Sequence, residues 1–381
     1  MHGWSCLVAG CLVLASLHAG AQSTQGLQGA TQGADCTASA SSACYRSFQP
    51  PESGGALHYY ASLSPDVATP ASPTRALIAM HGHPRDANKT FDAALQAVRG
   101  AGALADTLVV APVFQVAQDK AGKCSTPGVP AAEAGDLLWT CGSWLEGGRA
   151  GNGNGNGVTS FAAMDALVTE LTQRWPSLRT VTIAGFSAGA QMVQHYIGFA
   201  QERQAGSVAV RYVVADPGTW LYFDPVRPQP MRDGVAVAWA ACGSGADTLR
   251  NCTLTFTVAA DGACPALNRW KYGTDALPAS LGRNAAQARQ RYAAADVSYL
   301  EGALDSSDAK GTYYGILDKS CAATAQGPYR MQRGLAYAQY DRALLAPDKR
   351  REVVVVPGCA HDVACVFPSA AARGVLLGPS R

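Results

Sequence analysis

Residues 182–190, TIAGFSAGA, form the stretch of sequence that decides the fold. The apolar segment 180–184 leads into the five residues GFSAG, and an amphipathic segment, 188–200, follows them. This order predicts a buried strand, a sharp turn and a helix. At such a turn the serine is held in a strained conformation with its hydroxyl exposed, and the flanking glycines let the strand and helix backbones approach each other. Ser187 is therefore the candidate nucleophile.

Strands and helices are predicted to alternate along the rest of the chain. Apolar runs typical of strands occupy 57–62, 75–80, 107–112, 180–184, 208–215, 297–301 and 352–356. Helical patterns occupy 89–103, which Asn88 could cap, and 159–174, 188–200 and 326–345. This alternation predicts an α/β fold, a mainly parallel sheet with helices on both faces. We expect residues 51–381 to form this α/β domain.

Three segments depart from the alternation. Residues 22–50 begin with a stretch rich in Ser, Thr, Gly and Gln, and we expect them to form a flexible N-terminal segment. Residues 113–158 form a long irregular region, which in a compact domain is usually functional or mobile. Residues 224–294 contain three cysteines, many turns and little periodicity, so they predict a disulfide-rich insertion over the core.

A serine nucleophile needs a base, and His361 is the candidate. It follows the last apolar strand in the loop VPGCAHD, 356–362, at the carboxyl end of the predicted sheet. A base at that edge can reach Ser187. His195 lies two turns beyond Ser187 on the same predicted helix, so it points away from the serine hydroxyl.

Three aspartates are candidates for the acid that orients His361. Asp305 is favoured because it lies just past the strand 297–301 and could accept a hydrogen bond that fixes the tautomer of the imidazole. Asp216 ends the strand 208–215 in an Asp-Pro-Gly sequence that is also typical of a turn. Asp308 lies three residues beyond Asp305. We rank the three as Asp305, Asp216 and Asp308.

Two backbone N–H groups are candidates for an oxyanion hole. The first belongs to Ala188, at the N-terminus of the helix that follows Ser187, where the helix dipole favours negative charge. The second belongs to His83 in the loop HGHP, 81–84, where Gly82 allows a tight approach. Two histidines at this spacing are a weak metal signal, so we predict no metal site and no cofactor.

The N-terminus and the cysteines indicate export. Residues 4–21 are apolar and end in Ala-Gly-Ala, so we expect a signal peptide over 1–21 and a secreted or periplasmic protein, although a lipobox-like sequence leaves lipidation of Cys11 open. Of the 12 cysteines, Cys6 and Cys11 lie in this leader, which leaves ten, and an even number in an exported chain favours disulfides. The local pairs Cys36–Cys44 and Cys359–Cys365 are plausible, but the sequence does not determine the connectivity.

Composition excludes several classes of partner. The chain is 48% hydrophobic and 15% charged, so it can bury a large core. Its net charge is only +2, with no dense block of Lys or Arg, which argues against a nucleic-acid partner. No segment after the leader reaches the length of about 18 apolar residues that a membrane span requires. The sequence leaves the oligomeric state open.

The loop 81–84, the turn around Ser187, residues 302–305 and the loop 358–362 together resemble the serine hydrolases of the α/β-hydrolase superfamily. Within it, the chain is most similar to secreted bacterial esterases and proteins of the polyhydroxybutyrate depolymerase type. The resemblance implies acyl transfer: Ser187 attacks a carbonyl carbon, His361 moves the proton and Asp305 orients His361.

The substrate is less well defined by the sequence. Trp139, Trp144 and Trp220 fall in loops expected near the carboxyl edge of the sheet, where they could bind an apolar part of the substrate, small or polymeric, or simply pack beneath the loops. We expect a carboxylic-ester hydrolase. An amidase, peptidase or polymer depolymerase with the same three residues, or a non-catalytic binding protein of the same fold, are the alternatives.

Overall fold

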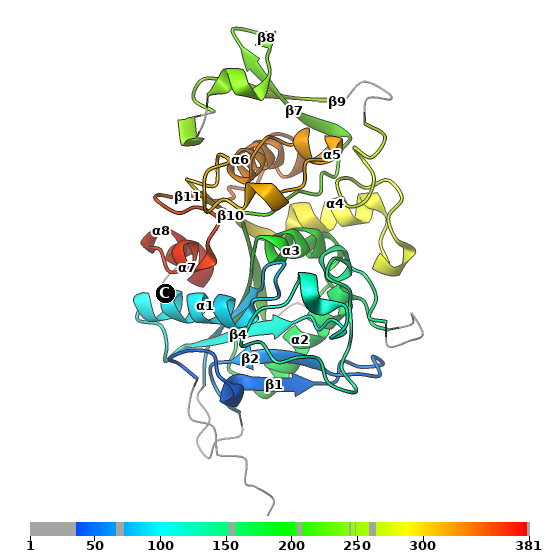
Figure 1. The fold of residues 1–381 in the computed structure, drawn as a ribbon, viewed down its shortest axis with the longest axis vertical. Helices are drawn as coiled ribbons and strands as arrows, with labels where there is room; N and C mark the ends of the chain where they lie inside the picture. Colours follow the sequence, from blue (N-terminus) through cyan, green and yellow to red (C-terminus); the bar gives the residue numbers. More distant parts are fainter. Residues whose placement is uncertain are drawn as a thin grey trace, which may run out of the picture. The chain divides into compact units, whose positions relative to one another are not determined.

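The computed structural model describes residues 36–65, 72–151, 157–203, 208–243, 245–247, 249–258 and 264–378. Within them, eight strands form one sheet in the order β1-β2-β4-β3-β5-β6-β10-β11 (Figure 1). These strands are β1 (Tyr45–Phe48), β2 (Leu57–Ala61), β3 (Arg75–Met80), β4 (Thr107–Val113), β5 (Thr180–Phe186), β6 (Ala209–Ala215), β10 (Asp296–Gly302) and β11 (Val353–Val356). Only β2 runs against its neighbours, β1 and β4, so the predicted mainly parallel sheet is confirmed.

Helices cover both faces of the sheet, because successive strand residues point to opposite sides. In β3, Ile78 belongs to one buried core and its neighbour Leu77 to the other. The first core is completed by α2 (Ser160–Arg174), α3 (Ala188–Phe199), α4 (Ala285–Ala294) and α6 (Arg330–Tyr340). The second is completed by α1 (Ala87–Gly100), α7 (Val363–Val366) and α8 (Ala370–Leu377), which lie together in Figure 1.

The predicted insertion is shorter than expected. Its strands β7 (Val226–Arg232), β8 (Val235–Ala236) and β9 (Thr253–Val258) form a separate sheet in the order β8-β7-β9. The last part of the predicted insertion is α4, which packs against α3 and leads into β10, so it belongs to the core. Only Ala288 and Tyr292 of α4 are buried, which leaves too weak an apolar pattern to show in the sequence.

The N-terminal prediction is wrong where the structure can be compared with it. The predicted leader, 1–21, and residues 22–35 lie outside the described residues. Residues 36–50 were expected to be flexible, but Cys36 is bonded to Cys44, and β1 pairs with β2. The strand was missed because it is short and only partly buried.

The first helix also starts earlier than predicted. It begins at Ala87, with Asp86 and not Asn88 at the N-cap. The Asp86 carboxylate does not cap the helix, because it accepts a hydrogen bond from the N–H of Gly82 instead.

Five disulfides join all cysteines from Cys36 onward, in the pairs Cys36–Cys44, Cys124–Cys141, Cys242–Cys252, Cys264–Cys321 and Cys359–Cys365. Both local pairs that the sequence favoured are confirmed. The short helix α5 (Cys321–Thr324) begins at one of these cysteines, and a π-helical segment, Asp341–Leu345, continues α6. None of the helices in the described ranges is both long and apolar enough to cross a membrane.

A glycine-to-alanine pair tests the packing of the turn at Ser187. A Cβ at Gly185 would overlap the backbone carbonyl of Gly189, whereas a Cβ at Gly374 of α8 meets nothing within 4 Å. We expect Gly185→Ala to lower the free energy of unfolding by about 1–3 kcal/mol through overpacking. Gly374→Ala is expected to raise it by up to about 1 kcal/mol, because alanine is the better helix former. Urea denaturation measures both, and equal effects would contradict this account of the turn.

Candidate active site

Ser187 lies at a strained turn between β5 and α3, as the sequence predicted. Its φ of 58° and ψ of −121° lie outside the regions that non-glycine residues usually occupy. The turn depends on two glycines: a Cβ at Gly185 would overlap Gly189, and a Cβ at Gly189 would come within 2.5 Å of the carbonyl oxygens of Met80 and His81. The close approach of β5, α3 and the end of β3 therefore holds the Ser187 hydroxyl at the carboxyl edge of the sheet.

The structure brings Ser187, His361 and Asp305 into one chain of hydrogen bonds. Nε2 of His361 lies 2.8 Å from Oγ of Ser187, and Nδ1 lies 2.7 Å from Oδ2 of Asp305. Because a carboxylate only accepts, Nδ1 carries the proton and Nε2 is left to accept from the serine hydroxyl. Of the three aspartates weighed in the sequence, Asp305 makes this contact. Asp216 bonds to the N–H of Gly302 instead, and Asp308 is exposed.

Asp305 has a second partner that the sequence analysis missed. Nη1 of Arg330, on α6, lies 3.3 Å from Oδ1 of Asp305 and donates to the carbonyl oxygen of Thr312 at 2.6 Å. Both charged side chains are buried. Arg330 therefore balances the charge of Asp305 and links it to the loop that follows. No local pattern marks this arginine in the sequence.

The loop that carries His361 is tied down on both sides. The Cys359–Cys365 disulfide encloses it. Leu304, next to Asp305, donates its N–H to the carbonyl oxygen of Cys359 at 2.8 Å, and the N–H of His361 donates to Gly311 at 3.2 Å. These contacts hold His361 against the segment that carries Asp305.

Burial sets the protonation state of His361. Its side chain is almost wholly enclosed, and removal from water lowers the pKa of the imidazole below its usual value. The hydrogen bond to Asp305 opposes this shift, and the positive charge of Arg330 reinforces it. The net direction of the pKa shift is downward, so the His361 imidazole is neutral at neutral pH.

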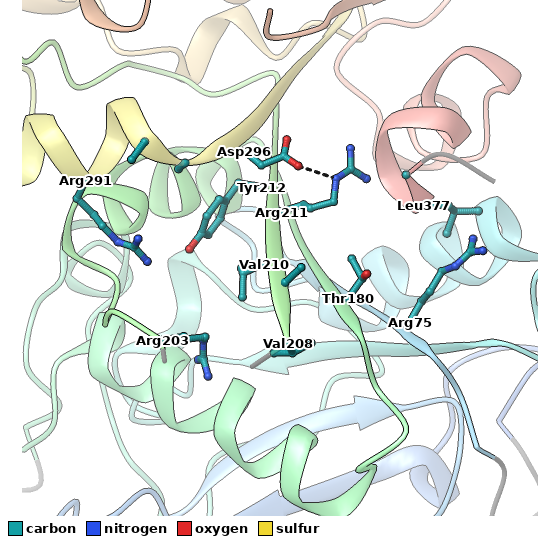
Figure 2. A pocket seen from close by; sticks show the side chains of 14 residues that line it. Arg75, Thr180, Arg203, Val208, Val210, Arg211, Tyr212, Arg291, Asp296 and Leu377 are labelled. Carbon is teal, nitrogen blue, oxygen red and sulfur yellow. Dashed lines mark hydrogen bonds and ion pairs between the residues drawn. The ribbon is translucent and has the colours of Figure 1, made fainter. Parts of the chain in front are cut away.

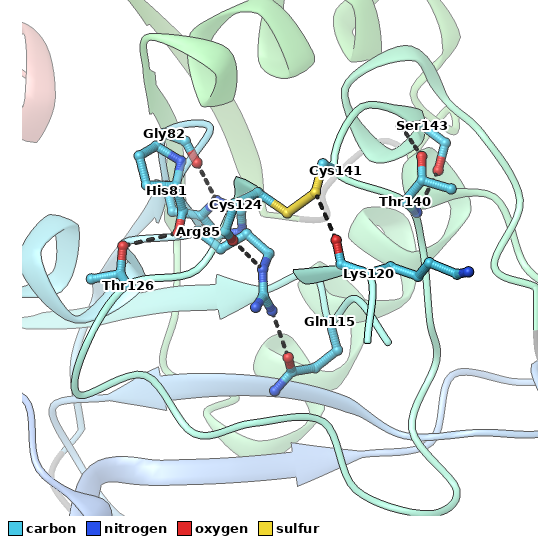
Figure 3. Close-up of a disulfide and its surroundings, with 11 residues drawn as sticks. His81, Gly82, Arg85, Gln115, Lys120, Cys124, Thr126, Thr140, Cys141 and Ser143 are labelled. Carbon is cyan, nitrogen blue, oxygen red and sulfur yellow. Dashed lines mark hydrogen bonds between the residues drawn. A yellow bond between two sulfur atoms is a disulfide. The ribbon is translucent and has the colours of Figure 1, made fainter. Parts of the chain in front are cut away.

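The loop after β3, part of which Figure 3 draws beside the Cys124–Cys141 disulfide, carries the candidate oxyanion donor His83. Asp86 Oδ1 accepts from the N–H of Gly82 at 2.8 Å. Arg85 donates from Nε to the carbonyl oxygen of Cys124 and from Nη1 to Gln115 Oε1, each at 2.7 Å, so the Cys124–Cys141 disulfide region supports this loop.

The two predicted oxyanion donors have no competing partner. Among the described residues, neither the N–H of His83 nor that of Ala188 has a hydrogen-bond acceptor. The loop and the turn at Ser187 adjoin each other at Gly189. His81, by contrast, is fully buried, and desolvation lowers its pKa to about 4, so it is a neutral core residue.

The predicted substrate contacts of three tryptophans are wrong. Trp144 and Trp220 are 0% exposed and Trp139 is 3% exposed, so none of them presents a surface to a ligand. Trp144 stacks on Phe114, and Trp220 stacks on Tyr337. The irregular loops that carry these residues fold inward, and their aromatic rings complete the core.

Exposed apolar side chains instead flank Asp305 along the chain. Leu304, Tyr313 and Ile316, which we call the apolar rim, are 53%, 62% and 75% exposed. The ring centroid of Tyr313 lies 6.2 Å from that of His361. Tyr313 of the rim therefore lies beside His361. The sequence signal of the rim is the presence of large apolar residues in an otherwise polar loop on either side of Asp305.

A cavity of about 650 Å³ lies at the opposite edge of the sheet (Figure 2). It is lined by Thr180 and Asp296, the first residues of β5 and β10, and by four arginines, Arg75, Arg203, Arg211 and Arg291. Arg211 is paired with Asp296 at 3.1 Å, and Arg75 with Asp106 at 3.3 Å. Ligands of parallel α/β sheets bind at the carboxyl ends of the strands, so this cavity is separate from the site at Ser187.

Comparisons with known proteins agree with this fold. No protein-family model and no curated protein matches the sequence. The structure is similar to poly(aspartic acid) hydrolase-1 from Sphingomonas sp. KT-1, with 17% identity, a TM-score of 0.52 and coverage of 87% of this chain and 98% of that one. It is also similar to LpqC, a poly(3-hydroxybutyrate) depolymerase from Bordetella parapertussis, with 16% identity, a TM-score of 0.53 and coverage of 87% of each chain.

At these identities the likeness defines the fold. The strand order, the single antiparallel strand and the strand-turn-helix at Ser187 are those of an α/β-hydrolase fold. The expected fold class and the resemblance to the α/β serine hydrolases are thereby confirmed at the level of the fold.

Proposed function

We propose that this protein is a serine hydrolase that cleaves carboxylic esters through an acyl-enzyme. The observation that carries the proposal is the unbroken hydrogen-bond chain from Ser187 through His361 to Asp305, which starts at a strained turn. Strain of this kind costs on the order of 1–3 kcal/mol and is concentrated at functional sites. A turn with a purely structural role would not require a serine at this position.

The chemistry follows from the protonation states. Oγ of Ser187 attacks the ester carbonyl carbon while its proton passes to Nε2 of His361. The oxygen of the tetrahedral intermediate accepts hydrogen bonds from the N–H groups of His83 and Ala188. His361 then gives the proton to the departing alkoxy oxygen, which leaves as the alcohol.

Hydrolysis of the acyl-enzyme repeats these steps with water. His361 takes a proton from the water as its oxygen attacks the acyl carbon, and then returns the proton to Oγ of Ser187 as the carboxylic acid leaves. Asp305 remains ionised and stabilises the imidazolium form of His361 in both halves. These steps use only groups of the protein and water.

The apolar rim is placed to contact the alcohol part of the ester. The leaving oxygen must lie beside Nε2 of His361, which protonates it, so the alcohol group extends on the His361 side of Ser187. Tyr313 lies on that side, with an exposed ring. We therefore expect substrates with an apolar alcohol part, which includes the repeating unit of a polyester.

Export is part of the proposal. Five disulfides in one chain favour an oxidising compartment, so we place the protein outside the cytoplasm, secreted or periplasmic. The two similar structures are named for a polyester and a polyamide substrate, so paired esters and amides with the same acyl group form the first substrate panel.

Substitution of the nucleophile tests the proposal. We expect Ser187→Ala to reduce kcat/KM for a p-nitrophenyl ester by at least about 10⁴-fold, because the acyl-enzyme can no longer form. Asp305→Asn is expected to reduce it strongly as well, whereas the exposed neighbour Asp308→Asn serves as a matched control with wild-type rates. Unchanged ester hydrolysis by Ser187→Ala would contradict the proposal, and exclusive turnover of the amides would favour an amidase.

The pH dependence of the reaction reports the state of His361. Because the pKa of His361 is lowered and the neutral form is the base, we expect kcat/KM to fall on acidification with a midpoint below about 6.5, the ordinary histidine value. Asp305 raises this pKa, so Asp305→Asn is expected to move the midpoint further toward acid. A wild-type midpoint above 6.5 would be inconsistent with the buried, neutral base.

The proposed contact between Tyr313 and the alcohol group can be tested by comparing variants of Tyr313 and Tyr314. With the acyl group fixed, we expect kcat/KM to rise with the length of an apolar alcohol, and Tyr313→Ala to flatten this trend. Tyr314→Ala is the matched control, since the Tyr314 ring packs on Tyr329. If both variants keep the wild-type trend, the rim does not bind the alcohol group.

A further inference from the structure

Two buried carboxyl groups lie beneath the site and have no role in the proposed chemistry. Asp216 directly follows β6, and Glu301 is the next-to-last residue of the neighbouring strand β10. Both are 0% exposed. Buried carboxyl groups are costly unless they are paired, hydrogen-bonded or neutral, so their presence here requires a physical reason.

Most of their oxygens receive no donor. Oδ1 of Asp216 accepts from the N–H of Gly302 at 2.8 Å. Oδ2 of Asp216 and both oxygens of Glu301 have no N–H or hydroxyl partner. The two carboxyl groups are within hydrogen-bonding reach of each other. Two adjacent buried carboxylates do not both ionise, so one proton held between them satisfies two of these three oxygens.

The surrounding backbone makes room for this pair. Gly334 lies in the middle of α6, and a Cβ there would overlap the carboxyl group of Glu301. Asp216 itself has a positive φ of 49°, a conformation that is uncommon for residues other than glycine. Both features cost local backbone stability, and the glycine leaves room for the Glu301 carboxyl group.

The pair contacts Gly302, which lies between the segment that carries Asp305 and the segment that carries His361. Gly302, which donates to Asp216, also supplies the carbonyl oxygen that accepts from the N–H of Asp305 at 3.0 Å. A Cβ on Gly302 would come within 2.8 Å and 2.9 Å of the carbonyl oxygens of Cys359 and Ala360, the two residues before His361. The position of Gly302 therefore determines the positions of both Asp305 and His361.

We propose that Asp216 and Glu301 share one proton and that this protonated pair is a positioning element, which fixes Gly302 and through it aligns Asp305 with His361. The proposal rests on the proposed function for its activity readout. When the shared proton dissociates, the carboxylates of Asp216 and Glu301 repel each other beside the negative charge of Asp305. This repulsion displaces Asp216 from its hydrogen bond with the N–H of Gly302. The enzyme is then inactivated at alkaline pH.

The charged groups around the pair support a transition in the mildly alkaline range. Burial, reinforced by the negative charge of Asp305, raises the pKa of Asp216 to about 8, and burial raises the pKa of Glu301 well above its ordinary value. Arg330 of α6 opposes both shifts. His361 faces Asp305 on the far side and is neutral in this pH range, so it contributes no compensating charge.

The experiment compares wild type with Glu301→Gln and Glu301→Leu. Glutamine keeps an uncharged donor at this position, and leucine removes the donor while it fills similar space. We expect wild-type kcat/KM to fall above about pH 8, and the fall to move up by at least about one pH unit in Glu301→Gln, because the amide has no proton to lose. Glu301→Leu is expected to lose more than about tenfold in kcat at pH 7 with little change in KM, since a buried acceptor is left unpaired.

The exposed Asp308→Asn serves as a control and should retain the wild-type profile. An alkaline fall that is identical in wild type and Glu301→Gln would overturn the proposal. So would full activity of Glu301→Leu at pH 7.

A stability measurement separates this proposal from the proposed function. A raised pKa means that the folded chain keeps a proton that the unfolded chain releases near pH 4, so this stabilisation is present at acid pH and is lost as pH rises toward the pKa of the pair. We therefore expect the wild-type melting temperature to fall between pH 5 and pH 8 more steeply than that of Glu301→Gln. Parallel curves would refute the shared proton, whether or not the protein hydrolyses esters.

Discussion

The site depends on one steric constraint, the contact between β5 and α3 at Gly185 and Gly189. Because neither residue has a Cβ, the helix begins directly where the strand ends, and Ser187 is forced into its strained conformation. The same contact brings Gly189 against the carbonyl oxygens of Met80 and His81. The helix N-terminus and the loop after β3 therefore adjoin each other. This packing places the loop that carries His83 beside the turn that carries Ser187.

Parallel strand pairing supplies the rest of the geometry. β5, β6, β10 and β11 are neighbours in the sheet and point the same way, so the residues that follow them meet at one edge. Ser187, Asp216, Asp305 and His361 each follow one of these four strands. Three of them form the hydrogen-bond chain, and the fourth joins Glu301 beneath it. Arg330, from α6, balances the negative charge that gathers there.

The sequence was sufficient to predict the contacts that arise from strand order. A residue placed just after a predicted parallel strand must lie at the shared edge, which is why Ser187, His361 and Asp305 were found together. The contacts that depend on tertiary packing were not predictable in this way. Trp139, Trp144 and Trp220 lie in irregular loops, and no local pattern shows whether such a loop folds inward or opens to solvent.

Other features left only faint sequence signals. Glu301 was visible as a carboxyl residue inside an apolar strand, but its partner, Asp216, lies 85 positions away along the chain. Gly334 looks like an ordinary glycine in a helix until its contact with Glu301 is known. The boundary of the insertion was misplaced because α4 buries only two side chains.

The central claim is that Ser187 is an activated nucleophile, and covalent labelling tests it most directly. The purified, oxidised protein would be treated with a fluorophosphonate probe at neutral pH, and the adduct would be located by peptide mass mapping, with Ser187→Ala as the control. The account predicts a single adduct on Ser187 and none in the variant. A folded protein that acquires no adduct, or acquires one elsewhere in the chain, would contradict it and favour a binding protein with the same fold.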